Sequence, residues 1–84
     1  MSLFFICYDL AKADENEYSD LFEVLEAMGA IRVQKSVWVV KAEKSASEIF
    51  EKLKSYFPDD QDRLLIGNVD GWSSRHSMNK IKNL

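Results

Sequence analysis

The stretch LFFICYDL, residues 3–10, determines how the rest of the chain is interpreted. It runs through aliphatic and aromatic residues without polar alternation until Asp9, and such a run is typical of a β-strand that is covered on both faces. Because side chains alternate along a strand, the odd-numbered residues, Asp9 included, lie on one face and the even-numbered residues on the other. The run is too short to cross a membrane and charged residues follow it, so we expect a cytoplasmic protein with no membrane contact.

A helix is predicted directly after this strand. Asp14 followed by Glu17 has the spacing of a capping box, in which the two residues satisfy each other's backbone amides. Apolar residues then recur every three or four positions along one helical face as far as Met28. Gly29 stands where a left-handed helix cap belongs, so we expect the helix to end there.

The second half of the chain contains signals for a hairpin, another helix and a last strand. Lys35 and Ser36 separate two short runs rich in residues that favour strands, which is typical of a hairpin. The two strands of this hairpin are predicted over residues 30–34 and 37–41. A helix is then predicted to start at a capping box of Ser45 and Glu48 and to end at Pro58. The last strand is predicted over residues 63–69, with a bulge or close approach at Gly67.

This order, βαββαβ, predicts an α+β, ferredoxin-like fold with a four-stranded antiparallel sheet and both helices on one face. Residues 1–70 would form the domain, and residues 71–84 a polar, locally basic C-terminal tail. The first and third strands carry apolar side chains on both faces, so the face without helices would be bare in a monomer. Soluble monomers rarely expose a contiguous apolar area beyond roughly several hundred Å². We therefore infer a homodimer packed through or beside that face.

The composition supports self-association and limits the partners. A chain of 84 residues buries only about 60 to 65% of its unfolded surface, so a monomer would be marginally stable without added burial. The single cysteine, Cys7, allows no internal disulfide and is interpreted as a packing residue. The net charge of −3 argues against a general attraction to phosphate backbones. Any contact with nucleic acid would be local, and the tail offers Arg75, Lys80 and Lys82 for it.

Several short motifs, in order, resemble the CRISPR-associated protein 2 family and its compact SinR-like relatives. The likeness covers roughly residues 3–73. It rests on Tyr8-Asp9-Leu10 at the end of the first strand, Gly29 after the first helix, Gln34-Lys35-Ser36-Val37-Trp38 and the continuation to Lys41, Ser45-Ala46-Ser47-Glu48-Ile49, Asp62-Arg63-Leu64-Leu65-Ile66, and Trp72.

The resemblance implies a ferredoxin-like homodimer in which Asp9 comes near its symmetry mate and binds a divalent metal for phosphodiester hydrolysis. Magnesium suits such a pair, because it prefers oxygen ligands and is held by one or two carboxylates together with water and substrate phosphates. In the same family the dimer also bridges integrase subunits that capture spacer DNA. The resemblance therefore implies magnesium as cofactor, and nucleic acid or an integrase subunit as partner.

Each candidate residue also has a purely structural interpretation. Asp9 could anchor its loop to Lys12 or accept backbone amides at the strand end. Ser36 could hydrogen-bond a phosphate or water near Asp9 in a supporting catalytic role, or serve only as a turn residue. Trp38 and Phe5 could stack on bases, although packing in the core or at a dimer interface is the stronger interpretation.

Two functional hypotheses follow. The first is a magnesium-dependent endonuclease that acts on nucleic acid at paired Asp9 side chains, and Ser36 favours it. The second is a non-catalytic dimeric adaptor of the same fold that binds a protein partner. The first helix favours the adaptor, because acidic residues occupy the stretch where family members usually carry Arg or Lys.

Overall fold

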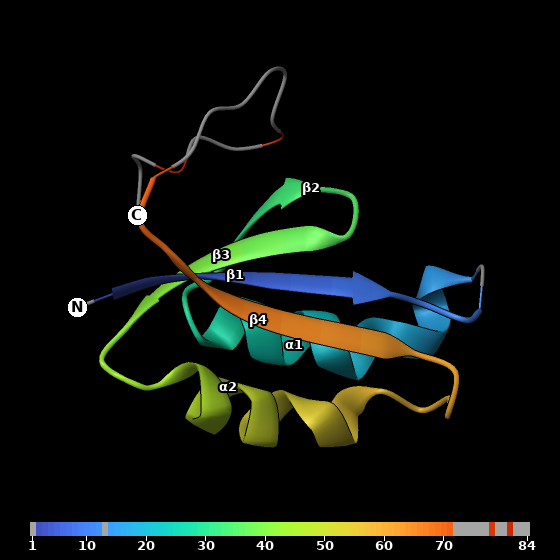
Figure 1. The fold of residues 1–84 in the computed structure, drawn as a ribbon. Helices are drawn as coiled ribbons and strands as arrows, with labels where there is room; N and C mark the ends of the chain where they lie inside the picture. Colours follow the sequence, from blue (N-terminus) through green and yellow to red (C-terminus); the bar gives the residue numbers. More distant parts are fainter. Residues whose placement is uncertain (1, 13, 72–77, 79–80, 82–84) are drawn as a thin grey trace.

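The structure, a computed structural model, describes residues 2–12, 14–71, 78 and 81 (Figure 1). Its elements follow the predicted order, with one 3-10 turn before the first helix and another after the second. They are β1 (Ser2–Asp9), η1 (Glu15–Tyr18), α1 (Ser19–Ala27), β2 (Ile31–Gln34), β3 (Val37–Ala42), α2 (Ala46–Leu53), η2 (Lys54–Tyr56) and β4 (Arg63–Val69). No helix within these ranges is both long and apolar enough to cross a membrane.

The four strands form one antiparallel sheet in the order β2-β3-β1-β4. Strands β1 and β3 lie in the middle, and β2 and β4 form the edges. Both helices lie on the same side of this sheet, as Figure 1 shows. The predicted α+β, ferredoxin-like arrangement is therefore confirmed for the single chain.

Helix starts follow local hydrogen bonding, with one difference from the prediction. The Ser45–Glu48 capping box is present, with both bonds at 3.1 Å. The expected reciprocal box of Asp14 and Glu17 is not formed. Instead Asp14 Oδ1 accepts the amide of Asn16 at 2.9 Å, because the chain enters α1 through a 3-10 turn whose tighter winding brings that amide within reach.

The end of α1 confirms the role predicted for Gly29. Its φ of 81° lies in the left-handed region, which glycine adopts without steric cost. The Gly29 amide donates to the carbonyl of Glu26 at 3.0 Å, and the Ala30 amide donates to the carbonyl of Leu25 at 3.1 Å. This pair of bonds is a Schellman motif, which satisfies two otherwise free carbonyls and turns the chain into β2.

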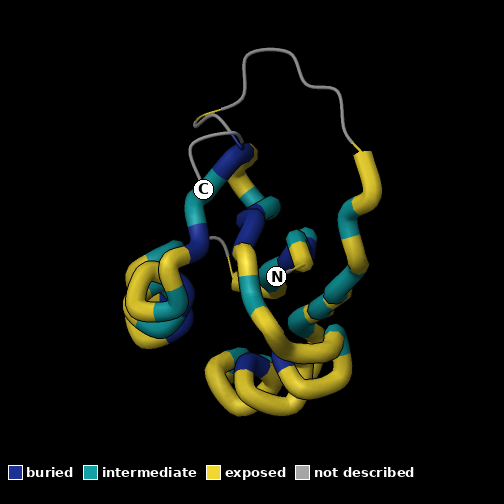
Figure 2. Tube along the Cα trace, turned by 90° about the vertical axis from the view of Figure 1, so that its left-hand side faces the viewer, coloured by how far each residue is buried: buried dark blue, intermediate teal, exposed yellow. Residues whose placement is uncertain are grey.

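The main core lies between the sheet and the helices. Even-numbered residues of β1 and β3 point into it, as the predicted alternation requires. The buried positions of both helical coils turn toward the strands (Figure 2). The buried members are Phe4, Ile6, Tyr8, Tyr18, Leu21, Leu25, Ala30, Trp38, Val40, Ile49 and Leu53.

The opposite face, called the outer face here, is not entirely bare, and the expectation that it would be is wrong. Ile81, only 7% exposed, packs with Val33 and Val39 in a second cluster over β2 and β3. The backbone amide of Met78 donates to the carbonyl of Val33 at 2.8 Å. Leu65 of β4, by contrast, is 66% exposed. Ile81 thus covers part of the β2–β3 half of the outer face, and apolar surface remains exposed on the β1–β4 half.

The irregularity of the sheet lies in β2, so the bulge or close approach predicted at Gly67 is wrong. The β1–β4 register continues without a shift through the pair Phe5 and Gly67, and a Cβ at Gly67 would meet nothing within 4 Å. The register shift instead falls between Arg32 and Gln34.

Candidate functional site

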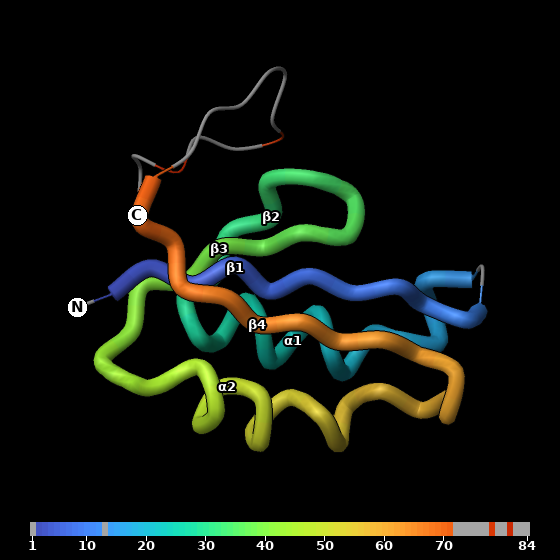
Figure 3. Tube along the Cα trace, in the orientation of Figure 1, coloured from blue at the N-terminus to red at the C-terminus, as the bar shows by residue number. Residues whose placement is uncertain are grey.

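The end of β1, the β2–β3 turn and the start of β4 lie together at one end of the sheet, as the trace in Figure 3 shows. Asp9 is the last residue of β1 and is paired with Arg63, the first residue of β4. Ser36 lies in the hairpin turn, and its carbonyl accepts the backbone amide of Tyr8 at 3.1 Å. The fold thus brings Asp9 and Ser36 into one neighbourhood.

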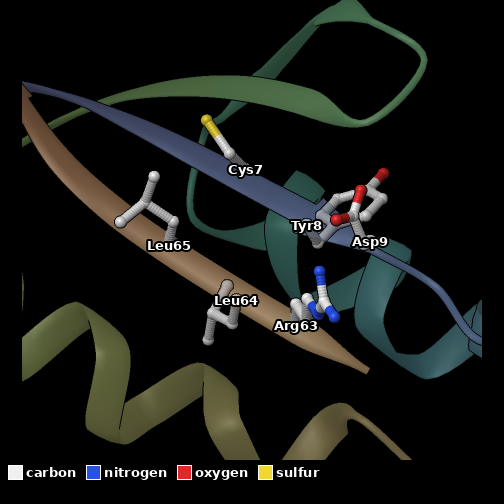
Figure 4. Close-up of a pocket in the computed structure, with 6 residues that line it drawn as sticks. All are labelled: Cys7, Tyr8, Asp9, Arg63, Leu64 and Leu65. Carbon is white, nitrogen blue, oxygen red and sulfur yellow. The ribbon is translucent and has the colours of Figure 1, made fainter. Parts of the chain in front are cut away.

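Asp9 lies on the outer face at the rim of a shallow pocket of about 250 Å³. Its side chain is exposed, and that of Arg63 is exposed beside it. Figure 4 shows the Arg63 guanidinium extending toward the Asp9 carboxylate. The pocket is lined by Cys7, Tyr8, Asp9, Arg63, Leu64 and Leu65. A carboxylate and a guanidinium therefore stand next to each other above an apolar strip of β1 and β4.

The loop after β1 is anchored by Asp62. Its Oδ1 accepts the amide of Ala11 at 2.7 Å and the hydroxyl of Tyr18 at 2.8 Å, and its Oδ2 accepts the amide of Asp59 at 3.1 Å. Desolvation favours the protonated carboxyl, but the bonds from Ala11, Tyr18 and Asp59 outweigh it and lower the pKa of Asp62. Asp62 therefore holds the loop after β1 against Tyr18 and against its own turn.

Asp9 itself makes no side-chain hydrogen bond or ion pair with the residues that the structure describes. Lys12, considered as its anchor, pairs with Glu17 at 3.7 Å instead. The carboxylate of Asp9 is thus presented to solvent on the outer face, while Asp62 performs the structural role that the sequence left open for Asp9.

The aromatic residues next to the site belong to the core. Trp38 is 4% exposed, and its Nε1 donates to the hydroxyl of Tyr8 at 2.9 Å. The Tyr8 hydroxyl in turn donates to the carbonyl of Lys35 at 3.3 Å, and burial raises the pKa of Tyr8. Phe5 packs against the outer-face cluster. The packing interpretation of Trp38 is confirmed, because a buried indole presents no face on which a base could stack.

Cys7 lies on the outer face between Phe5 and Asp9. It is half-buried, and desolvation raises the pKa of its thiol. A raised pKa reduces the thiolate fraction at neutral pH and with it the nucleophilicity of the sulfur. The thiol is therefore suited to packing, as predicted, rather than to chemistry.

Asp9 is the carboxylate at this pocket that could serve as a magnesium ligand. No group of three or more His, Cys, Asp or Glu side chains that could hold a metal occurs within residues 2–12 and 14–71. Asp9 supplies exposed carboxylate oxygens, which are the ligand type that magnesium prefers. The donor set therefore fits a largely hydrated ion with one carboxylate per chain. Arg75, Lys80 and Lys82, predicted to contact nucleic acid, lie outside the described residues.

Sequence reasoning did not identify Arg63 as part of the site. Arg63 could have been found from the antiparallel pairing of β1 with β4, because this pairing places the first residue of β4 opposite the last residue of β1. Because Asp9 and Arg63 are 54 positions apart in the sequence, no local motif connects them.

A comparison with protein families identifies one that covers this arrangement. The family model described as CRISPR associated protein Cas2 matches residues 1–76. The matched range contains every strand of the sheet, both helices and the pocket that holds Asp9 and Arg63.

Proposed function

The chain belongs to the CRISPR-associated protein Cas2 family, and from this we propose that it is a homodimeric, magnesium-dependent endonuclease. Asp9 from each of two copies would hold the ion near the two-fold axis, and the substrate would be a phosphodiester bond of nucleic acid. In this role the protein would work in the cytoplasm, where its substrate and magnesium are both present.

The observation that carries the proposal is the state of the Asp9 carboxylate. It is exposed at the end of β1, on the outer face, with no side-chain partner in the described part of the chain. The neighbouring Asp62, in contrast, accepts three hydrogen bonds that hold the loop and Tyr18. An exposed acid without a structural task, in a pocket beside a cation, is suited to binding an ion or a substrate.

When bound, magnesium would supply an activated water and offset negative charge on the phosphate oxygens. The residues of this chain have simpler tasks. Asp9 would hold the ion at the rim of the pocket, and the Ser36 hydroxyl, on the adjoining hairpin turn, would hydrogen-bond a phosphate oxygen or a water. The backbone bond between Ser36 and Tyr8 keeps that turn beside the end of β1.

The remaining apolar surface supports the dimer. Leu65 is 66% exposed, and it lies beside Cys7 in the β1–β4 pairing, on the same face as Asp9. Covering such a leucine with a second copy would contribute about 1.5 kcal/mol or more. A two-fold contact through this half of the outer face would also bring two Asp9 side chains toward one axis.

The catalytic test uses labelled RNA and DNA oligonucleotides, with magnesium titrated against purified protein. Asp9→Asn keeps the size of the side chain and removes its charge, so cleavage is expected to fall by about 100-fold or more, because the metal ligand is weakened. Asp20→Asn is the matched control, since Asp20 is an exposed acid on α1. Cleavage that is equal in the Asp9→Asn and wild-type preparations would come from a contaminating enzyme and would refute the proposal.

The dimer is tested separately by analytical ultracentrifugation over a range of protein concentrations. Leu65→Glu places a charge in the proposed contact and is expected to give monomers. Tyr56→Glu, at an apolar position of η2 that is 36% exposed, is expected to leave the dimer intact. A wild-type protein that sediments as a monomer at micromolar concentration would rule out the paired site.

A second candidate function is a non-catalytic dimeric adaptor that binds a protein such as an integrase subunit. The negative charge of the chain favours it, because −3 at neutral pH opposes nucleic-acid binding outside local cationic positions. A wild-type dimer that cleaves none of the oligonucleotides at any magnesium concentration would support the adaptor over the endonuclease.

A further inference from the structure

We propose that Arg63 binds the phosphate of the nucleic-acid substrate directly beside Asp9, so that a cation site and an anion site adjoin across β1 and β4. The inference rests on the proposed function for the identity of the substrate, and it deepens that function by naming the group that recognises the phosphodiester. Three properties of the described residues carry it: the register of the two strands, the different environment of Arg32, and the charge balance at the pocket.

The register places the side chains of Asp9 and Arg63 next to each other. Asp9 and Arg63 are directly opposite each other in the antiparallel β1–β4 pair. Residues so paired have Cβ atoms about 4.5 to 5.5 Å apart and point to the same face of the sheet. Both side chains are exposed and both line the same pocket (Figure 4). A phosphate held by the Arg63 guanidinium through two oxygens would therefore lie next to the Asp9 carboxylate.

Arg32, the other arginine within the described ranges, is engaged in the fold. Its guanidinium lies 5.0 Å from the ring centre of Phe22 and 5.8 Å from that of Trp38, and it pairs with Glu15 at 3.1 Å. These contacts hold α1 and η1 against β2. Arg63, by contrast, sits at the first position of an edge strand with its side chain in solvent.

The charges at the pocket explain why a cation is needed there. An anionic substrate is repelled by a carboxylate such as Asp9 and by a chain of net charge −3. A guanidinium next to the carboxylate offsets that repulsion locally. Its planar fork of donors also matches two phosphate oxygens at once, which a lysine ammonium cannot do. Asp9 and Arg63 do not form an ion pair with each other, so both remain available for a metal and a phosphate.

The test separates phosphate binding from catalysis by measuring binding in EDTA. The probes are fluorescein-labelled single-stranded RNA and DNA of about 20 nucleotides. Arg63→Ala is expected to weaken the affinity for at least one probe by about tenfold, because a charge-assisted contact is lost. The slope of log affinity against log salt should fall by about 0.7, the value for one phosphate contact on a single strand. Arg63→Lys should fall between Arg63→Ala and the wild type.

Lys41→Ala is the matched control for the loss of one exposed positive charge. Lys41 is paired with Leu3 at the other end of β1, far from the Asp9 end of the sheet. Its removal should change affinity by less than about twofold. Thermal melting by circular dichroism confirms that each variant is folded before binding is compared.

The outcomes distinguish this inference from the proposed endonuclease. If the wild type cleaves nothing but Arg63→Ala still weakens binding selectively, the phosphate site stands and the catalytic proposal fails. A second outcome is that Asp9→Asn abolishes cleavage while Arg63→Ala binds both probes with the same affinity as Lys41→Ala. In that case the phosphate site is overturned and the endonuclease stands. A wild type that binds neither probe overturns the phosphate site as well.

Discussion

Replacing Asp62 and Asp9 by alanine, one at a time, tests whether the two acids have different tasks. Asp62 holds the loop after β1, because its two oxygens accept hydrogen bonds from Ala11, Tyr18 and Asp59. Asp9 has no side-chain partner in the described part of the structure. We expect Asp62→Ala to destabilise the fold strongly and Asp9→Ala to leave the free energy of unfolding almost unchanged.

The size of the difference follows from the hydrogen bonds of Asp62. Each bond to a charged acceptor contributes about 1.5 to 3 kcal/mol, and solvent near the exposed bond from Ala11 reduces its share. The low end of this range for the two part-buried bonds, from Tyr18 and Asp59, gives about 3 kcal/mol for Asp62→Ala, and in a domain of this size that corresponds to a fall in Tm of about 15 °C. Asp62→Asn keeps the Oδ1 acceptor but turns an amide donor toward the Asp59 amide, so it should lose about half as much. Asp9→Ala is an exposed change and should stay within about 0.5 kcal/mol.

The assay is urea denaturation followed by circular dichroism at several pH values. The pKa of Asp62 in the folded protein is lowered from its ordinary value of 3.8, so its stabilising effect is fully present above that value. The effect is lost as the pH falls through the lower folded pKa. The difference between the wild type and Asp62→Ala should therefore be largest near neutral pH and should shrink below about pH 3.8.

Asp60→Ala is the matched control, because Asp60 is an exposed acid in the same turn. It should resemble the wild type at every pH. The reasoning is refuted if Asp9→Ala destabilises the protein as much as Asp62→Ala, since Asp9 would then be a structural residue. It also fails if Asp62→Ala and Asp60→Ala unfold at the same urea concentration.

Three further changes test how the fold is built, each by urea denaturation at neutral pH. Gly29→Ala should cost about 1 kcal/mol, because the φ of 81° strains a residue with a Cβ. Ser45→Ala removes the hydroxyl that accepts the Glu48 amide and should cost about 1 kcal/mol. Ile81→Ala should cost about 2 kcal/mol or more, since its side chain is buried on the outer face, whereas Met78→Ala, at a side chain that is 61% exposed, should cost much less. Equal effects at positions 81 and 78 would mean that Ile81 does not pack on the sheet.

The order of elements could be predicted because its signals are local. Gly29 ends α1 through bonds to residues of the preceding turn, and Ser45 starts α2 through a residue three positions away. Side-chain alternation then assigned the faces of β1 and β3 correctly, since a strand has only two faces. The start of α1 was predicted less well, because Asp14 can cap either an α-helical or a 3-10 turn and the sequence does not distinguish them.

The site could be predicted only in part, because its pairings are distant in the chain. The sequence identified Asp9 from a motif, but its neighbour Arg63 follows from strand register. The anchoring role of Asp62 depends on bonds to residues 51 and 44 positions away, Ala11 and Tyr18. An acidic residue in a turn gives no local sign of such partners. An acid that anchors the fold, such as Asp62, thus becomes distinguishable from an acid without side-chain partners in the described residues, such as Asp9, only when the strands are paired.

The coverage of the outer face places the proposed site and the proposed dimer on the same surface. Ile81 packs over Val33 and Val39, and both of these side chains on the β2–β3 half of this face are buried. The β1–β4 half keeps the exposed Leu65, and the row of cross-strand pairs that contains it ends at Asp9 and Arg63. A second copy that covers Leu65 must therefore approach these charged side chains. Burying them without a counter-ion or a substrate would be unfavourable, because unpaired charges are costly to desolvate. A dimer through this half of the sheet is thus compatible with the charges only if they stay at a hydrated cleft, which is the environment that a hydrated magnesium ion and a phosphate require.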